Sequence, residues 1–448
     1  MKANSSSRRK PLYKRNIFDQ NFDRKVINRI AHSSGFVGRS DGKIDARSLI
    51  VSFMQMLSKG LKSYSALASE ISVTKGITLS KQAVEERMNV KTSQMIKEVY
   101  QANFEKMAKE NPTRLLKGLK AKFGGAIYTE DCTHGNLPEE LAHHYPGNVS
   151  RGKVKSQFKL HTLYNLTNNR FGFIGLNSFR DNDQSLAMKA LDHLKKGDLL
   201  LRDLGFFVSS ALRLLDKQGV YFVTRMRSDI NLFEPKSQQK FNLIKRLRKN
   251  SYYDGVILVG NKHKIPLRLT VLPLSSEHAS ERRRKAKQNR DRRLNHSPQY
   301  YKLLGYRILL TNIPYEKCSA QEIAQLYGLR WRIEIIFKSW KSCLSLEKII
   351  PNKCKNIHRI NCIIYFMLLY ILLFQTFWLR CCQYKKGNFN RYFHLSLLKI
   401  AAFFNQHFQS IINNTNSQAV IWKIAQTCTH EVRHDRKNTM EIYRKLAA

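Results

Sequence analysis

The sequence predicts an α/β protein built around a central sheet, and three observations support this class. Short apolar runs bounded by turn residues alternate with helical periodicity between residues 121 and 227. Mainly helical stretches lie on either side, at 1–120 and 316–448. Hydrophobic residues make up 42% of the 448 residues, which is enough to bury a sizeable core. We therefore expect two or three folded domains and not a disordered chain.

The chain is strongly basic, with 78 Lys and Arg against 33 Asp and Glu and a formal net charge of +45. A surplus of this size indicates a polyanionic partner, above all nucleic acid. The eight cysteines form no C-x-x-C pair, which is typical of reduced thiols in a cytoplasmic protein. The apolar run 360–379 is long enough to span a bilayer, but Asn361, Gln375 and Thr376 interrupt it. We expect a buried core helix there and no membrane partner.

Residues 1–120 are predicted to be a helical, basic DNA-binding region. A short helix, a turn at Gly76 and a second helix with Ser80 as its N-cap resemble a helix-turn-helix. The second helix of such a motif enters the major groove, which makes Lys81 and Arg87 candidate DNA contacts. Two short helices joined by a glycine turn remain the ordinary alternative.

From residue 121 to 227 the expected order is three strands, a helix over 185–196, a strand, a helix and a strand. This order matches the ribonuclease-H-like fold. The first and fourth strands each carry an aspartate, Asp131 and Asp203, where a hydrophobic residue is expected. A buried carboxylate is costly unless it is paired, although capping of a turn at the strand end is an alternative explanation.

Residues 228–315 interrupt this unit and are predicted to form a β-rich insertion. Strand-like segments flank a basic run, 281–293, that contains Arg282, Arg283 and Arg284. Such a run is usually a solvated loop or helix face, but in a basic protein it is also a candidate for lying along a phosphate backbone.

One long helix is expected from Ser319, which forms a candidate capping box with Glu322. Its apolar stripe comprises Leu326, Leu329, Ile333, Ile336 and Trp340. The opposite face carries Tyr327, Arg330, Glu334, Lys338 and Lys341. Intrahelical ion pairs on a wet surface explain that polar face, and a shared functional task is the alternative.

These motifs together resemble a known family. The pattern Tyr327-x2-Arg330-x3-Glu334-x6-Lys341 resembles the YREK signature of the insertion-sequence-four family of DDE transposases. The sequence DCT at 131–133 resembles the first-aspartate motif of that family, and DLGFF at 203–207 resembles the second. The interval before Glu334 leaves room for the β-rich insertion that the family places there.

The resemblance implies a ribonuclease-H-like catalytic core in two parts, 121–227 and 316–350, separated by the insertion domain 228–315. Helical regions at 1–120 and 351–448 would flank it. The resemblance also implies two divalent metal ions, Mg²⁺ or Mn²⁺, held by Asp131, Asp203 and Glu334. Oxygen ligands suit these ions, and a pair of them can activate a nucleophile and stabilise a leaving 3′ oxygen.

The family further implies that Tyr327, Arg330 and Lys341 contact the transposon end, and the helical spacing adds Lys338. Some relatives flip a base onto a tryptophan of the insertion domain. The tryptophans here are at 331, 340, 378 and 422, outside the insertion. Tyr306 is a candidate stacking partner instead, with a core or edge tyrosine as the alternative.

We therefore predict a transposase of a bacterial insertion sequence that binds terminal inverted repeats, cleaves DNA strands and transfers them to target DNA. Synapsis of two ends predicts a dimer on DNA, and the DNA substrate predicts a cytoplasmic, nucleoid-associated protein. Two alternatives stay open: a ribonuclease-H-fold nuclease without strand transfer, and a catalytically silent DNA-binding protein.

Overall fold

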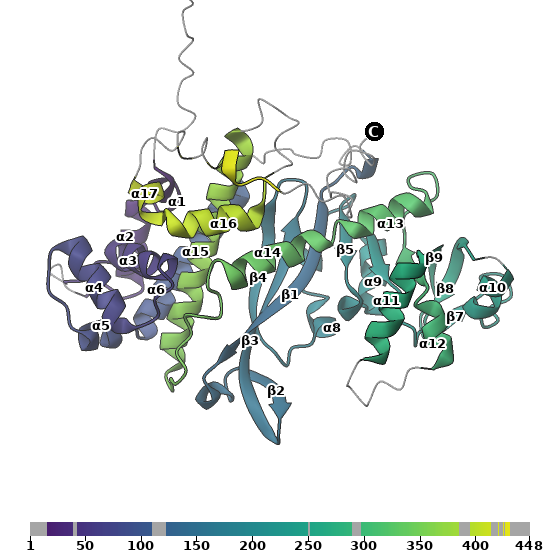
Figure 1. The fold of residues 1–448 in the computed structure, drawn as a ribbon, viewed down its shortest axis with the longest axis horizontal. Helices are drawn as coiled ribbons and strands as arrows, with labels where there is room; N and C mark the ends of the chain where they lie inside the picture. Colours follow the sequence, from purple (N-terminus) through teal and green to yellow (C-terminus); the bar gives the residue numbers. More distant parts are fainter. Residues whose placement is uncertain are drawn as a thin grey trace, which may run out of the picture.

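A computed structural model of the chain describes residues 16–38, 43–109, 122–249, 251–288, 297–384, 395–413, 420, 424 and 426–430. Figure 1 shows three neighbouring regions along its long axis: a group of helices, a central sheet crossed by one helix, and a second strand-rich region. The end of the basic run, 289–293, lies outside the described residues.

The described residues form one mixed sheet of ten strands. In chain order these are β1 (Ile127–Leu137), β2 (Pro146–Ser150), β3 (Lys153–Asn165), β4 (Arg170–Ser178), β5 (Leu199–Arg202), β6 (Tyr221–Arg225), β7 (Leu232–Phe233), β8 (Tyr253–Val259), β9 (Ile265–Pro273) and β10 (Tyr306–Thr311). The sheet order is β2-β3-β1-β5-β6-β10-β9-β8-β7, and β4 also pairs with β3. Strand β3 pairs antiparallel with both β4 and β1, whereas β1, β5 and β6 are parallel. This arrangement confirms the predicted ribonuclease-H-like core.

The strands of the predicted insertion continue the core sheet. Strand β10 pairs antiparallel with β6 on one side and with β9 on the other. Leu269 and Leu310 share a hydrophobic cluster with Phe222 of β6. The β-rich character of the insertion is therefore confirmed, and its sheet is continuous with that of the core. The domain boundaries at 227/228 and 315/316 remain predictions.

Helices cover both faces of the sheet and build the flanking region. They are α1 (Ile17–Asn21), α2 (Arg24–Ser33), α3 (Ala46–Ser58), α4 (Tyr64–Lys75), α5 (Lys81–Arg87), α6 (Val90–Lys109), α8 (Asp183–Leu186), α9 (Ser209–Lys217), α10 (Leu243–Lys249), α11 (Ser276–Lys287), α12 (Pro298–Leu303), α13 (Ala320–Gly328), α14 (Trp331–Ser342), α15 (Ile357–Tyr384), α16 (Leu397–Gln406) and α17 (Phe408–Asn413). Short 3₁₀ turns are η1 (Glu139–Leu141), η2 (Leu191–His193) and η3 (Leu204–Phe206). Figure 1 shows α14 lying across the sheet next to β1.

Helix α15 contains the apolar run that the sequence marked as a core helix. It packs against α6, α3, α1 and α16, and 94% of its most apolar window is buried. Phe366 of α15 stacks on Phe53 of α3 with ring centroids 4.0 Å apart. The predicted buried core helix is therefore confirmed, and it joins the N-terminal and C-terminal helical regions through a shared core.

The predicted pair of short helices in the N-terminal region is present as α4 and α5. Gly76 ends α4 in the left-handed conformation (φ 65°), which glycine adopts without steric cost. Ser80 caps α5 by accepting a hydrogen bond from the backbone N–H of Ala83. Both boundary predictions are confirmed, and DNA contact by this region remains a prediction.

The helix predicted over 185–196 is wrong. The segment forms the single turn α8, and the following backbone bonds, such as Leu191 N–H to Met188 C=O, span three residues and not four. One physical reason is that the carbonyl of Ala187, which a continuing α-helix would use, accepts a hydrogen bond from buried Arg202.

The single long helix predicted from Ser319 is also wrong, because it divides into α13 and α14 at Leu329 and Arg330. Three-residue bonds, including Arg330 N–H to Tyr327 C=O, tighten the chain at this junction, where Gly328 lowers helix propensity. The predicted capping box of Ser319 and Glu322 is confirmed. The predicted apolar stripe is buried throughout.

Candidate active site

Asp131 and Asp203 project from the same face of the sheet. Asp131 follows Ile127 at even spacing on β1, and Asp203 comes directly after β5, where it precedes η3. Their neighbours Ile127 and Leu201 belong to the hydrophobic cluster that also contains Ile333 of α14. The predicted strand period is confirmed, because both aspartates lie on the side of the sheet covered by α13 and α14.

Two polar residues of the predicted signature, Tyr327 and Arg330, form hydrogen bonds with the three carboxylates. Arg330 donates to Glu334 Oε1 at 2.5 Å and to Asp131 Oδ2 at 3.4 Å, so its guanidinium lies between the two acids. The Tyr327 hydroxyl donates to Asp203 Oδ1 at 3.1 Å. Residues far apart in sequence therefore meet at one site, and the polar face of the helix is not a simple solvated surface.

The environment of Asp131 disfavours its charged form. Burial raises the pKa of Asp131 to about 7, against the opposing effects of the Cys132 N–H and Arg330. The nearby charges of Asp203 and Glu334 raise this pKa further. Burial also raises the pKa of Tyr327, and the neighbouring Asp203 adds to that rise. A carboxylate with a pKa near 7 next to two others is typical of a functional site.

The donor set at this site suits a hard divalent cation. Carboxylate oxygens are the ligands that Mg²⁺ prefers. In the described part of the chain, no three His, Cys, Asp or Glu side chains are gathered closely enough to hold a metal ion. Here Arg330 lies between Asp131 and Glu334 and supplies the compensating positive charge. The residues fit the ion by chemistry, and binding it requires Arg330 to give up at least one carboxylate.

Two lysines extend the polar face along α14. Lys338 is exposed, and Lys341 forms an ion pair with Glu347 at 2.8 Å. Both partners of that pair are about a third or more exposed, at 35% and 41%. Exposed ion pairs contribute little free energy, so the Lys341 ammonium is free to exchange its partner for an incoming phosphate.

A cavity of about 320 Å³ opens beside the carboxylates. Its lining includes Tyr327 and Arg330 of the signature and, from the strand-rich region, Arg225, Arg282, Tyr300, Tyr306 and Arg307. Trp331, with 56% of its surface exposed, also lines the cavity. Tyr306, the candidate stacking residue, therefore lies at the site, although it also packs against the core.

Three arginines of this cavity have no carboxylate partner in the described residues. Arg282 donates to the Tyr306 carbonyl at 3.1 Å, and Arg307 donates to the Ala324 carbonyl at 3.3 Å. Burial lowers the pKa of Arg282, and the like charges of Arg225 and Arg307 lower it further. Uncompensated positive charges of this kind attract an anion such as a phosphate.

Apart from Arg282, the other predicted DNA contacts lie outside the cavity. Arg282, Arg283 and Arg284 fall on α11, where Arg283 donates to the Tyr301 carbonyl at 3.2 Å and Arg284 is exposed. Lys81 is exposed at the start of α5. Arg87 turns inward, where it donates to the Phe36 carbonyl at 2.7 Å and lies over the Phe36 ring.

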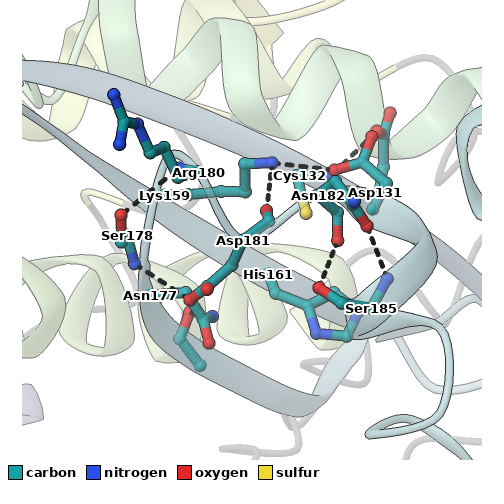
Figure 2. Close-up of polar contacts among 12 residues, drawn as sticks. Asp131, Cys132, Lys159, His161, Asn177, Ser178, Arg180, Asp181, Asn182 and Ser185 are labelled. Atoms are coloured by element: carbon teal, nitrogen blue, oxygen red, sulfur yellow. Dashed lines mark hydrogen bonds and ion pairs between the residues drawn. The ribbon is translucent and has the colours of Figure 1, made fainter. Parts of the chain in front are cut away.

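The segment after β4 lies on the face of the sheet opposite to the two aspartates. It is hydrogen-bonded there to Lys159 of β3, as Figure 2 shows. Lys159 donates to the Asp181 carbonyl at 2.7 Å and to Asp183 Oδ1 at 3.0 Å. A Cβ atom at Gly205 would lie only 2.8 Å from the other carboxylate oxygen of Asp183. This close approach explains why glycine occupies the third position of the DLGFF motif.

Sequence reasoning missed two groups of charged residues. Glu130 and Arg202 precede the two aspartates and form a buried ion pair. Their opposite charges at matching positions of two adjacent strands were the signal that could have found them. Nothing in the local sequence marks Arg225 and Arg307 as neighbours, because only the pairing of β6 with β10 brings them together.

Comparisons with known proteins agree with this geometry. A family model described as "Transposase DDE domain" matches residues 131–371. The transposase for insertion sequence element IS1151 of Clostridium perfringens is 26% identical over 379 residues, which cover 80% of this chain and 78% of that protein. The transposase for IS231F of Bacillus thuringiensis subsp. israelensis is 26% identical over 329 residues, covering 68% and 67%.

Among solved structures, the chain is similar to the piggyBac transposase in a synaptic complex with hairpin DNA. The TM-score is 0.46 at 9% identity, over 94% of this chain and 86% of that one. This degree of likeness carries no weight beside the sheet order and the family match. The matched range 131–371 spans more than half of the chain and contains Asp131, Asp203 and Glu334, so the protein belongs to the transposase DDE-domain family.

Proposed function

We propose that the protein is the transposase of a bacterial insertion sequence. It binds the terminal inverted repeats of its element, cleaves DNA strands at their ends and joins the freed 3′ ends to target DNA. The observation that carries this proposal is that Arg330 bridges Asp131 and Glu334, while Tyr327 of the adjoining helix binds Asp203, beside a cavity lined by arginines. Carboxylates that face phosphates weaken simple binding, which speaks against a protein that only binds DNA. Its relatives are named as transposases of insertion sequence elements.

Membership of this family implies dependence on divalent metal ions, and we infer two ions, Mg²⁺ or Mn²⁺, held by Asp131, Asp203 and Glu334. Bound there, they would lower the pKa of the attacking hydroxyl and stabilise the leaving 3′ oxygen. Without a cation, Asp131 holds a proton for part of the time near neutral pH, because its pKa is about 7. Arg330 and Tyr327 keep the carboxylates oriented in that state.

DNA would approach along the polar face of α13 and α14. Arg330 can exchange a carboxylate for a phosphate, to which a guanidinium offers two parallel hydrogen bonds. Lys341 and exposed Lys338 would supply point charges further along the backbone. Arg225, Arg282 and Arg307, which have no carboxylate partner in the described residues, support a phosphate or a strand end in the adjacent cavity.

Two transposon ends must be held together for joining, so we infer two protein copies on the DNA. Lys81 of α5 and Arg283 and Arg284 of α11 would add contacts outside the catalytic centre, and half-buried Arg87 would instead stabilise α5. Because its substrate is the chromosome, the protein works in the cytoplasm, and we propose association with the nucleoid.

An assay of joined products tests this function. Purified protein, Mg²⁺ and a duplex carrying the DNA sequences that flank the gene are incubated with a supercoiled target plasmid. Covalent joining of the 3′ ends to the plasmid is expected. Cleavage without joining would identify a ribonuclease-H-fold nuclease, and stable binding without cleavage would identify a catalytically silent protein.

A further inference from the structure

A second set of polar side chains lies on the other face of the sheet, opposite the two aspartates. It consists of Glu130, His161 and Arg202, which we call the buried triad, and all three side chains are 0% exposed. Arg202 donates from Nε to Glu130 Oε2 and from Nη2 to the Ala187 carbonyl. His161 Nε2 lies 2.7 Å from Glu130 Oε1. Glu130 is thereby bound on both carboxylate oxygens.

Stability alone does not account for this triad. Replacing a buried ion pair by apolar residues of similar volume is often neutral or stabilising, because desolvation of the two charges offsets their attraction. Two buried nitrogen atoms also lack a hydrogen-bond partner in the described residues, Arg202 Nη1 and His161 Nδ1. Unpaired buried groups cost free energy. A different benefit must explain why charged residues occupy this position.

The position of the ion pair in the sheet provides that benefit. Strands β1 and β5 are parallel, and Glu130 opposite Arg202 is the last rung of their ladder. The next residue of each strand is a catalytic candidate, Asp131 on one and Asp203 on the other. Because side chains alternate, a bond on one face of the sheet fixes the backbone from which the aspartates project on the opposite face.

The third member of the triad, His161, contacts this part of the sheet from β3. His161 comes from β3, and its ring lies between Phe173 and Phe206, with ring centroids 5.3 Å and 5.6 Å away. Phe206 belongs to η3, the turn that follows Asp203. The triad therefore connects β1, β3, β5 and the turn after the second aspartate at a single point.

We propose that Glu130 and Arg202 are positioning residues that set the separation and orientation of Asp131 and Asp203 for divalent metal binding. The inference rests on the proposed function, because it assigns the pair a task at that site. Neither residue touches DNA or metal, since both are fully buried. Loss of the pair releases the ends of β1 and β5 and weakens metal binding, while the fold and the DNA-binding surfaces persist.

The test uses the full-length double variant Glu130→Met/Arg202→Met, which removes both charges and keeps similar side-chain volume. We expect a thermal midpoint and an affinity for end DNA close to those of the wild type. Affinity for Mn²⁺, measured by calorimetry without DNA, should fall about 10- to 100-fold, as is common for residues that orient metal ligands. Cleavage should need correspondingly more Mg²⁺.

A matched control is a second ion pair of the described sheet, Arg268 with Asp254, whose side chains are 4% and 13% exposed. It bridges β8 and β9 at 2.7 Å, away from the catalytic carboxylates. The variant Asp254→Met/Arg268→Met should leave Mn²⁺ affinity within about twofold of the wild type. An equal loss in both double variants would mean general damage to the sheet and would overturn the proposal.

Conservative variants keep the proposal testable if the double variant does not fold. Arg202→Lys retains the charge but loses the fork of donors, and Glu130→Gln retains the shape but loses the charge. Each should weaken Mn²⁺ binding by a smaller factor. Unchanged Mn²⁺ affinity in all folded variants would reject the positioning role. Failure of the wild type to cleave DNA would instead reject the proposed function.

Discussion

The two faces of the sheet at β1 and β5 carry charged residues in opposite states. On the face covered by α14, Asp131 and Glu334 are partly exposed, at 21% and 31%, and share one arginine whose closer bond goes to Glu334. On the other face, Glu130 and Arg202 are fully buried and paired with each other. Asp131 thus belongs to a site where two carboxylates share one arginine, whereas the adjacent Glu130 has an arginine of its own. The comparison indicates that the second arrangement supports the first.

The largest expected effect comes from the three carboxylates on the face covered by α14. Changing Asp131, Asp203 or Glu334 to Ala should lower strand cleavage by about a thousandfold or more, because residues that act as a unit fail together. Binding of end DNA should remain within a few-fold, since each change removes a negative charge. Gel-shift and cleavage assays on the same preparations measure both. Mg²⁺-dependent cleavage at wild-type rate by any of the three would remove that residue from the site.

The buried face should respond differently to single and double changes. Arg202→Met alone leaves the buried Glu130 carboxylate without its guanidinium and with only the His161 contact, which should cost about 3–5 kcal/mol of unfolding free energy. The double change Glu130→Met/Arg202→Met should recover most of that loss. Urea denaturation of the three proteins gives the values. Equal destabilisation in the single and double variants would show that the two charges do not depend on each other.

The fold was predictable from the sequence because the strands of the core are short apolar runs in a distinctive order. The two aspartates were found because each breaks such a run, and the polar face of α14 followed from helical spacing. The buried pair was missed because only the parallel pairing of β1 with β5 brings Glu130 and Arg202 together. The lost helix after α8 depends on a tertiary contact, the Arg202 bond to Ala187, that local propensity does not contain. At the break near Leu329, Gly328 was a local signal that the apolar periodicity of the predicted helix outweighed.

The third prediction concerns pH dependence without metal ions. The pKa of Asp131 is about 7 in the folded protein, whereas an aspartate in an unfolded chain has a pKa of about 4, so the folded state binds more protons between these values. Wild-type stability should therefore fall as pH rises from about 4 to 7. Asp131→Asn lacks this loss and should be the more stable protein at pH 8, by about 2–4 kcal/mol.

Denaturation with and without EDTA and Mg²⁺ checks this sign. Below pH 4 the two proteins should converge, and Mg²⁺ should restore the stability of the wild type but not of the variant. A variant that is less stable than the wild type at pH 8 in EDTA would mean that Asp131 is well compensated. The contrast between the two faces would then disappear.

A smaller effect is expected from the arginine cavity. Changing Arg225, Arg282 and Arg307 together to Ala should reduce the slope of log affinity against log salt by about 2 to 3, if each contacts one phosphate. Arg213, exposed on α9, offers a control in the variant Arg213→Ala. Filter binding of end DNA at several salt concentrations measures the slopes. Equal slopes for the wild type and the triple variant would exclude phosphate binding by the cavity.

The smallest effect should come from Lys341. Its surface ion pair with Glu347 contributes little, so Lys341→Ala should leave stability within about 0.5 kcal/mol and lower the salt slope by about 0.9. Lys338→Ala should change the slope by no more than that. An unchanged slope for Lys341→Ala would remove this lysine from the DNA contacts.

The central claim is that Asp131, Asp203 and Glu334, on the face covered by α14, perform strand transfer on DNA. Its most direct measurement is the structure of the products that purified protein makes from a duplex of its own element ends and a target plasmid in Mg²⁺. We predict 3′ ends covalently joined to the plasmid by the wild type, and no joined product from Glu334→Ala or in EDTA. Joined products from Glu334→Ala, or joining that persists in EDTA, would contradict this account.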